Sequence, residues 1–66
     1  MRYTIQNELK ERDIVNFEIC FKTKSIKNIF KNKDELMTDT IKVVSILNKY
    51  SINYTMSNNY DFSIVI

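Results

Sequence analysis

Five lysines in the middle of the sequence are the strongest candidates for contacts with a binding partner. They lie in a stretch that has no acidic residue between positions 19 and 33, and they are Lys22, Lys24, Lys27, Lys31 and Lys33. Ammonium groups attract phosphate backbones and acidic protein surfaces, and they raise the rate of encounter with such partners. Phe21 and Phe30 lie nearby and would add a stacking surface for bases. We therefore expect these lysines to contact a partner, either protein or nucleic acid; a solvated loop is the plain alternative.

The residue types that most enzymes need are missing. The chain has no histidine and no glycine, so no ordinary base can activate Cys20 or a serine, and no glycine-rich loop can hold a phosphate. Cys20 is the single cysteine, which excludes an internal disulfide and a zinc site built from four Cys and His ligands. A nearby lysine can lower the pKa of a thiol, but we interpret Cys20 as an incidental strand residue. We predict that the protein is not an enzyme and uses no metal or cofactor.

One pair of acidic residues could in principle bind Mg²⁺. Glu35 and Asp39 lie four residues apart, next to Asp34, on the expected exposed side of a helix. Acids are also favoured in the first turn of a helix, where they face the positive end of its dipole. We interpret these residues as a helix start.

That helix is predicted over residues 34–50. Asn32 can cap it, and Glu35 three residues later completes a capping-box pattern. Apolar residues recur at helical spacing along one face, with further apolar residues widening the stripe; they are Leu36, Thr40, Val43, Leu47 and Tyr50, widened by Met37, Ile41 and Val44. Ile46 lies off this stripe, so we expect a partner to cover it.

Alternating apolar residues predict strands on both sides of the helix. Residues 15–22 alternate with period two, as do residues 52–57 and 60–66. Asn58 and Asn59 separate the last two segments and favour a hairpin turn, because asparagine tolerates positive φ. The last strand ends in β-branched residues, so it lies either inside the sheet or at an edge that pairs with another chain.

Two segments are ambiguous. For residues 1–12 we favour a strand over 2–5 followed by a helical turn, and the alternative is a short helix over 4–12. Residues 25–31 have apolar side chains at helical spacing behind a serine, which is compatible with one or two helical turns.

These elements predict a single α+β domain over residues 1–66. We expect a small, four-stranded, mainly antiparallel sheet in the order ββαββ, with one long helix packed on one face. The other face would be polar, and its residues would be Arg2, Thr4, Asn16, Glu18, Cys20, Lys22, Asn53, Thr55, Ser63 and Val65. Val65 is an apolar exception on that face, so with Ile46 it is a candidate interface residue. A homodimer through the terminal strand or the open sheet face is one possible assembly.

A chain of 66 residues leaves little room for an enclosed substrate cavity. The leading hypothesis is therefore a small, non-enzymatic interaction protein that binds a larger protein, at an acidic or nucleic-acid-binding groove, and inhibits it. The alternative is a small regulatory protein that places the same lysines directly on nucleic-acid phosphates. Enrichment in Ile, Lys and Asn, with no Ala, Gly or Pro, indicates a low-GC genome, which suggests a phage or mobile-element inhibitor of a host or defence protein. Residues 1–9 lack a signal-peptide core and no segment is apolar enough to span a bilayer, so we expect a cytoplasmic location and no membrane partner.

Overall fold

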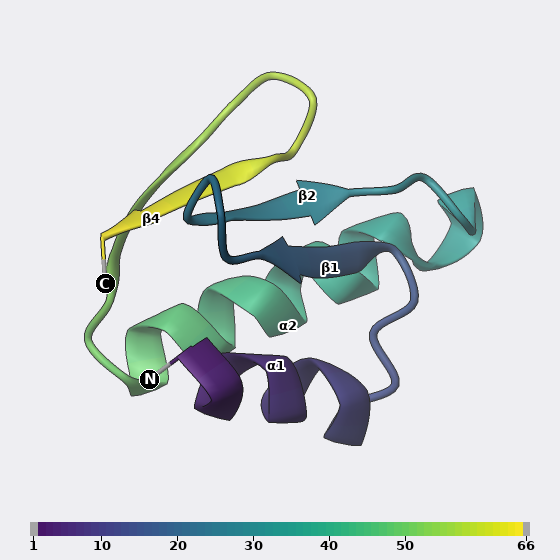
Figure 1. Ribbon diagram of the computed structural model, residues 1–66. Coiled ribbons are helices and arrows are strands. Elements are labelled where there is room, and N and C mark those ends of the chain that lie inside the picture. The colour runs from purple at the N-terminus through teal and green to yellow at the C-terminus, as the bar shows by residue number, and fades with distance from the viewer. Residues whose placement is uncertain (1, 66) are drawn as a thin grey trace.

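The computed structural model describes residues 2–65, which form a four-stranded antiparallel sheet covered by two helices (Figure 1). Neighbouring strands pair in the order β1-β2-β4-β3. The elements are α1 (Arg2–Glu11), β1 (Phe17–Cys20), β2 (Ser25–Asn28), the 3-10 helix η1 (Lys33–Glu35), α2 (Leu36–Lys49), β3 (Asn53–Met56) and β4 (Phe62–Val65). The predicted α+β class, the antiparallel sheet and the long helix on one face are confirmed.

The N-terminal segment is helical, so the favoured strand over residues 2–5 is wrong and the alternative helix is confirmed. Ile5 and Leu9, four residues apart, share one helix face and are both buried. Residues 25–28 form a strand rather than helical turns. Sheet pairing outweighs the local helical spacing here, because β2 pairs with β1 on one side and with β4 on the other. The order of elements is therefore αββαββ.

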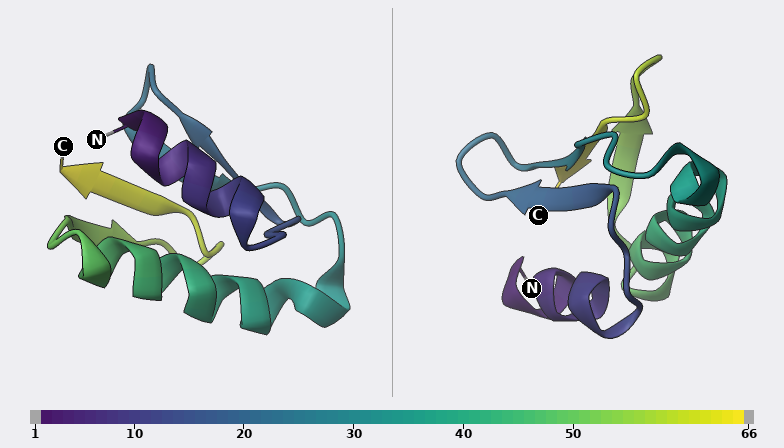
Figure 2. Two further views of the ribbon diagram at one scale, coloured as in Figure 1. Left: turned by 90° about the horizontal axis from the view of Figure 1, so that it is seen from below. Right: turned by 90° about the vertical axis from the view of Figure 1, so that its right-hand side faces the viewer.

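Both helices cover the same face of the sheet (Figure 2). α1 contacts β1, α2 contacts β3, and the helices contact each other. The ring of Phe62, which is fully buried, packs against Phe17 and Tyr54 at centroid distances of 5.7 and 5.5 Å. The core between the layers consists of Ile5, Leu9, Ile14, Phe17, Ile26, Val43, Ile46, Leu47, Ile52, Phe62 and Ile64.

Ile46 is part of this core, with 0% of its surface exposed. The prediction that Ile46 lies at the surface for a partner is therefore wrong. Met37 and Ile41, which the apolar pattern places in the buried stripe, are 62% and 60% exposed instead. The buried side of α2 is rotated toward α1, as the ion pair between Lys49 and Glu8 indicates. A second helix on the same face therefore decides which side of α2 is buried.

The C-terminal strand lies inside the sheet. β4 pairs with β2 and β3, so the central alternative is confirmed and β4 has no free edge for a second chain. The free edges belong to β1 and β3. Val65 is 72% exposed, as expected. On the face opposite the helices, the strands alternate to present Glu18, Cys20, Ser25, Lys27, Asn53, Thr55, Ser63 and Val65.

The hairpin between β3 and β4 turns at the predicted asparagines, but the residue with positive φ is Tyr60, at 64°. The Ser57 hydroxyl oxygen accepts hydrogen bonds from the backbone N–H groups of Asn59 and Asp61, both at 3.2 Å. These hydrogen bonds stabilise a turn that contains no glycine.

Both helices end in the same hydrogen-bonded motif. The second residue beyond each helix has positive φ, and the backbone N–H of the residue after it donates to a leucine carbonyl in the last helical turn, which is a Schellman motif. The residues are Leu9, Asp13 and Ile14 after α1, and Leu47, Ser51 and Ile52 after α2. The leucine and isoleucine of each motif are buried, so both helix ends are anchored in the core.

Candidate functional site

The structure divides the five lysines into two groups at opposite ends of β2. Lys22 and Lys24 lie in the turn between β1 and β2, whereas Lys31 and Lys33 follow the far end of β2. Lys27 lies between them, on the open face of the sheet. All five are exposed, and none has an acidic partner at ion-pair distance within residues 2–65. The predicted lysine surface is thus two separate groups, and the turn pair can meet a partner without the other pair.

The backbone of the β1–β2 turn is held firmly while its ammonium groups stay in solvent. Lys24 adopts a φ of 53°, and its carbonyl accepts a hydrogen bond from the Ile64 N–H at 3.0 Å. The hydroxyls of Thr23 and Ser25 share a hydrogen bond of 2.6 Å across the turn. The turn therefore presents Lys22 and Lys24 from a fixed backbone.

Lys27 has a different electrostatic environment. It pairs across the strands with Glu18 of β1, and it borders an open depression of about 290 Å³ that also contains Asp61. The Asp61 carboxylate accepts a hydrogen bond from the Asn28 N–H at 2.7 Å. Acidic groups on both sides of Lys27 weaken its attraction for an anionic partner.

Cys20 lies at the end of β1 and is half-buried. Hydrogen bonds from the side chain and backbone of Thr23 lower the pKa of the Cys20 thiol, and the charge of Lys27 acts in the same direction. Residues 2–65 contain no cluster of metal-binding side chains. The chain also has no histidine that could act as a base for the thiol.

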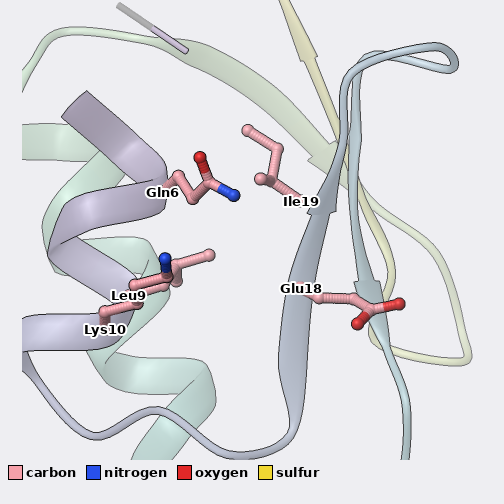
Figure 3. Close-up of a pocket in the computed structure, with 5 residues that line it drawn as sticks. All are labelled: Gln6, Leu9, Lys10, Glu18 and Ile19. Atoms are coloured by element: carbon pink, nitrogen blue, oxygen red, sulfur yellow. The ribbon is translucent and has the colours of Figure 1, made fainter. Parts of the chain in front are cut away.

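A groove lies between α1 and β1 (Figure 3). In Figure 3, Gln6 and Leu9 of α1 face Ile19 of β1, and Glu18 points away from the helix. The groove has a volume of about 270 Å³ and opens to solvent, and its lining residues are Gln6, Leu9, Lys10, Glu18 and Ile19. At the end nearest the β1–β2 turn, the rings of Tyr3 and Phe21 pack together at a centroid distance of 5.5 Å.

The groove runs beside a free strand edge. The Ile29 N–H donates to the Asn16 carbonyl at 2.7 Å, and hydrogen-bonded pairs alternate along an antiparallel ladder. The backbone groups of Phe17 and Ile19 therefore point away from β2, toward the free edge of β1. The strand predicted over residues 2–5 would have paired with this edge. The spacing of Ile5 and Leu9 was the signal that a helix lies there instead.

A buried polar cluster fixes the start of β1 onto α2. Asp39 is 1% exposed, so its predicted place beside Glu35 on an exposed helix face is wrong. Its Oδ2 accepts hydrogen bonds from the backbone N–H groups of Val15 and Asn16, both at 3.1 Å, and from Asn16 Nδ2 at 2.9 Å. Asn16, predicted on the open sheet face, is also fully buried, and its side chain forms two hydrogen bonds with the backbone of Asn32.

A second polar cluster joins α1 to the end of α2. Glu8 Oε2 accepts hydrogen bonds from Lys49 Nζ and the Tyr50 hydroxyl, both at 2.8 Å, and Oε1 accepts one from Arg12 Nε at 3.3 Å. The bond from Lys49, with that from Tyr50, lowers the pKa of Glu8 to about 2. The same contact raises the pKa of Lys49. These bonds to one carboxylate hold the two helices together, and because two cations surround one anion, the cluster keeps a net single positive charge.

Neither helix has the length and apolar composition needed to cross a membrane, among the residues that the structure describes. A scan of protein-family models and searches of curated proteins and of solved structures find no match for this chain.

Proposed function

We propose that this chain is a non-enzymatic binding protein that attaches to a larger partner protein through the β1–β2 turn and inhibits it by covering part of its surface. The observation that carries the proposal is the exposure of Lys22 and Lys24 on a firmly held turn, with no acidic partner within residues 2–65. Charges at the rim of an interface steer the approach of a complementary surface and select against like-charged ones. The partner surface is therefore acidic where it meets the turn.

Nucleic acid is the second candidate partner, and one observation favours it. Tyr3, which is 71% exposed, packs against Phe21 beside the turn lysines, and aromatic rings next to cations bind unpaired bases. Against it, the turn has no arginine, the residue best suited to bidentate phosphate contacts. The protein partner is the stronger proposal.

Two double charge reversals test the proposed function. The K22E/K24E variant changes the turn, and K31E/K33E makes the same charge change at the other end of β2. We expect proteins that wild-type chain captures from a bacterial lysate to be lost with K22E/K24E and retained with K31E/K33E, as read by mass spectrometry. Circular dichroism confirms that both variants are folded. Equal capture by wild type and K22E/K24E would show that the turn is not the contact surface.

A gel-shift assay distinguishes the second candidate. If the lysines contact phosphates, a single-stranded RNA or duplex DNA probe shifts at low salt, and the affinity falls steeply as salt rises. We expect no such shift, and a shift abolished by K22E/K24E would replace the protein partner with nucleic acid.

A further inference from the structure

We propose that the free edge of β1 binds an extended segment of the partner protein as an additional strand, with apolar side chains in the α1–β1 groove and acidic side chains beside Lys22 and Lys24. This inference rests on the proposed function and defines the partner chemistry for the same turn. It also explains how so small a contact could be specific, because strand addition combines backbone hydrogen bonds with side-chain selection.

The backbone of β1 supplies the hydrogen bonds. Phe17 and Ile19 direct their N–H and C=O groups away from β2, as the bond from Ile29 to Asn16 implies. Phe17 is only 4% exposed, so the half-buried Ile19 offers the groups that are open to a partner. An edge strand with such groups is a template for another strand. β2, on the other side of β1, already satisfies the groups of Glu18 and Cys20.

The groove selects apolar side chains. Successive side chains of an added strand point alternately to the two faces of the sheet. Those on the helix side would lie over the groove, between Leu9 and Gln6 on α1 and Ile19 on β1. Beyond them, the exposed ring of Tyr3 against Phe21 offers further apolar area. The partner segment therefore has an apolar residue at every second position.

The charged side chains around β1 determine where the partner segment can carry acidic residues. Lys22 and Lys24 lie just past the end of β1 at the turn, whereas Lys10 lies on the groove wall at the level of Glu18 (Figure 3). Glu18, on the open face, lies nearer the start of the strand. An acidic residue is attracted at the turn end and repelled beside Glu18. The segment is consequently acidic at the end that lies at the turn.

The other free edge lacks this selectivity. β3 directs the backbone groups of Tyr54 and Met56 outward, because Ser57 and Asp61 form the hydrogen-bonded pair at the end of that ladder. Its residues, Asn53–Met56, carry no charge. A strand added there has backbone hydrogen bonds but no cation from β3 to attract an acidic end.

The test is selection from a displayed library of random eight-residue peptides on the full wild-type chain. We expect enriched peptides to alternate apolar and polar residues and to carry acids at one end. On binding, the amide proton of Ile19 should become protected from hydrogen exchange, while those of Tyr54 and Met56 do not. Protection at β3 instead, no enrichment, or peptides without alternation would each overturn the proposal.

Variants locate the contact. The affinity of an enriched peptide should fall about tenfold with K22E/K24E and less than about twofold with K31E/K33E. Ile19→Pro removes an outward N–H, and Gln6→Trp fills the groove without changing a residue of β1, so each should abolish binding. The second variant covers the case in which the proline variant does not fold. M56P is the matched control on β3 and should bind normally.

The two proposals fail separately. If K22E/K24E loses the captured partner but Gln6→Trp retains it, the turn is the contact surface and strand addition is wrong. If K22E/K24E retains the partner, the proposed function itself is wrong. A dimer of the chain that protects the same β1 amide, or an oligonucleotide that does so, would also overturn the peptide as occupant.

Discussion

Two carboxylates in this protein each join segments that are far apart in the sequence, but they do so with different donors. Among residues 2–65, the donors to Asp39 are two backbone N–H groups and an asparagine amide, and Asp39 is 1% exposed. Glu8 accepts from a lysine, an arginine and a tyrosine, and the Lys49 and Arg12 side chains are 54% and 34% exposed.

The comparison shows that two carboxylates with similar structural roles differ in how strongly salt and pH affect their hydrogen bonds. The two Asn16 donors buried with Asp39 have no water to replace a missing acceptor, so removal of the carboxylate leaves them unsatisfied. The charged donors around Glu8 can return to solvent, and their attraction is weakened by salt and by protonation. The Asp39 cluster therefore sets the fold, and the Glu8 cluster adjusts the packing of α1 on α2.

The largest expected effect is that of removing the Asp39 carboxylate. Asp39→Ala leaves the N–H groups of Val15 and Asn16 without their acceptor, which should lower the free energy of unfolding by about 3 kcal/mol or more. That is a large part of the roughly 3–10 kcal/mol expected for a domain of this size. Urea unfolding followed by circular dichroism measures the loss. Ser45→Ala, at an exposed position of α2, is the control, and a similar loss in both would contradict the assigned role.

Glu8→Gln should have a smaller effect, and one that depends on pH. The pKa of Glu8 is lowered from the ordinary 4.5 to about 2, so the folded state binds its proton less readily than the unfolded chain. The stabilisation is fully present above pH 4.5 and is lost as the pH falls toward 2. The wild-type advantage over the variant in urea midpoint should shrink across that interval. A constant difference would show that the ion pair is not its source.

Glycine at either helix end should stabilise the protein slightly. Ser51→Gly and Asp13→Gly each relieve a positive φ, at 55° and 54°, which costs roughly 1 kcal/mol in a residue with a Cβ. The flexibility of glycine in the unfolded chain offsets part of this gain, so we expect about 0.5 kcal/mol at each end. Thermal unfolding measures the change. A loss of stability at both positions would contradict the assigned cost of the positive φ.

The smallest effect on stability should come from K22E/K24E. Neither lysine is in an ion pair within the part of the chain described, so the free energy of unfolding should change by less than about 0.5 kcal/mol. Urea unfolding of this variant beside Asp39→Ala shows whether the binding turn and the structural clusters are separable. A loss comparable to that of Asp39→Ala would mean that the turn is part of the folding core.

Local sequence patterns correctly predicted the elements whose residue spacing is typical of one kind of secondary structure. The helix over residues 34–50 has apolar side chains at helical spacing and a capping residue, and Asn32 does cap η1 by accepting a hydrogen bond from the Asp34 N–H at 3.1 Å. The capping box is incomplete, however, because the Asn32 N–H donates to Asn16 Oδ1 instead of to Glu35. The acceptor of the Asn32 N–H is therefore a side chain 16 positions away in the sequence.

Patterns failed where two elements compete for one place. α1 is short and its residues suit both a helix and a strand, so only its packing beside α2 decides between them. The same packing buries Ile46 and exposes Met37 and Ile41. The lysines were correctly predicted to be exposed, but their separation into two groups required the strand assignment of residues 25–28.

By itself, the sequence determined the α+β class, the long helix, three of the strand segments and the absence of histidine and glycine chemistry, because these depend on residue type and short-range spacing. The tertiary structure alone decided that β1 has a free edge, that a groove lies beside it, and that Asp39 and Asn16 are buried. The physical reason is that strand pairing and helix packing join segments distant in the chain, and no local pattern records which surface each segment will meet.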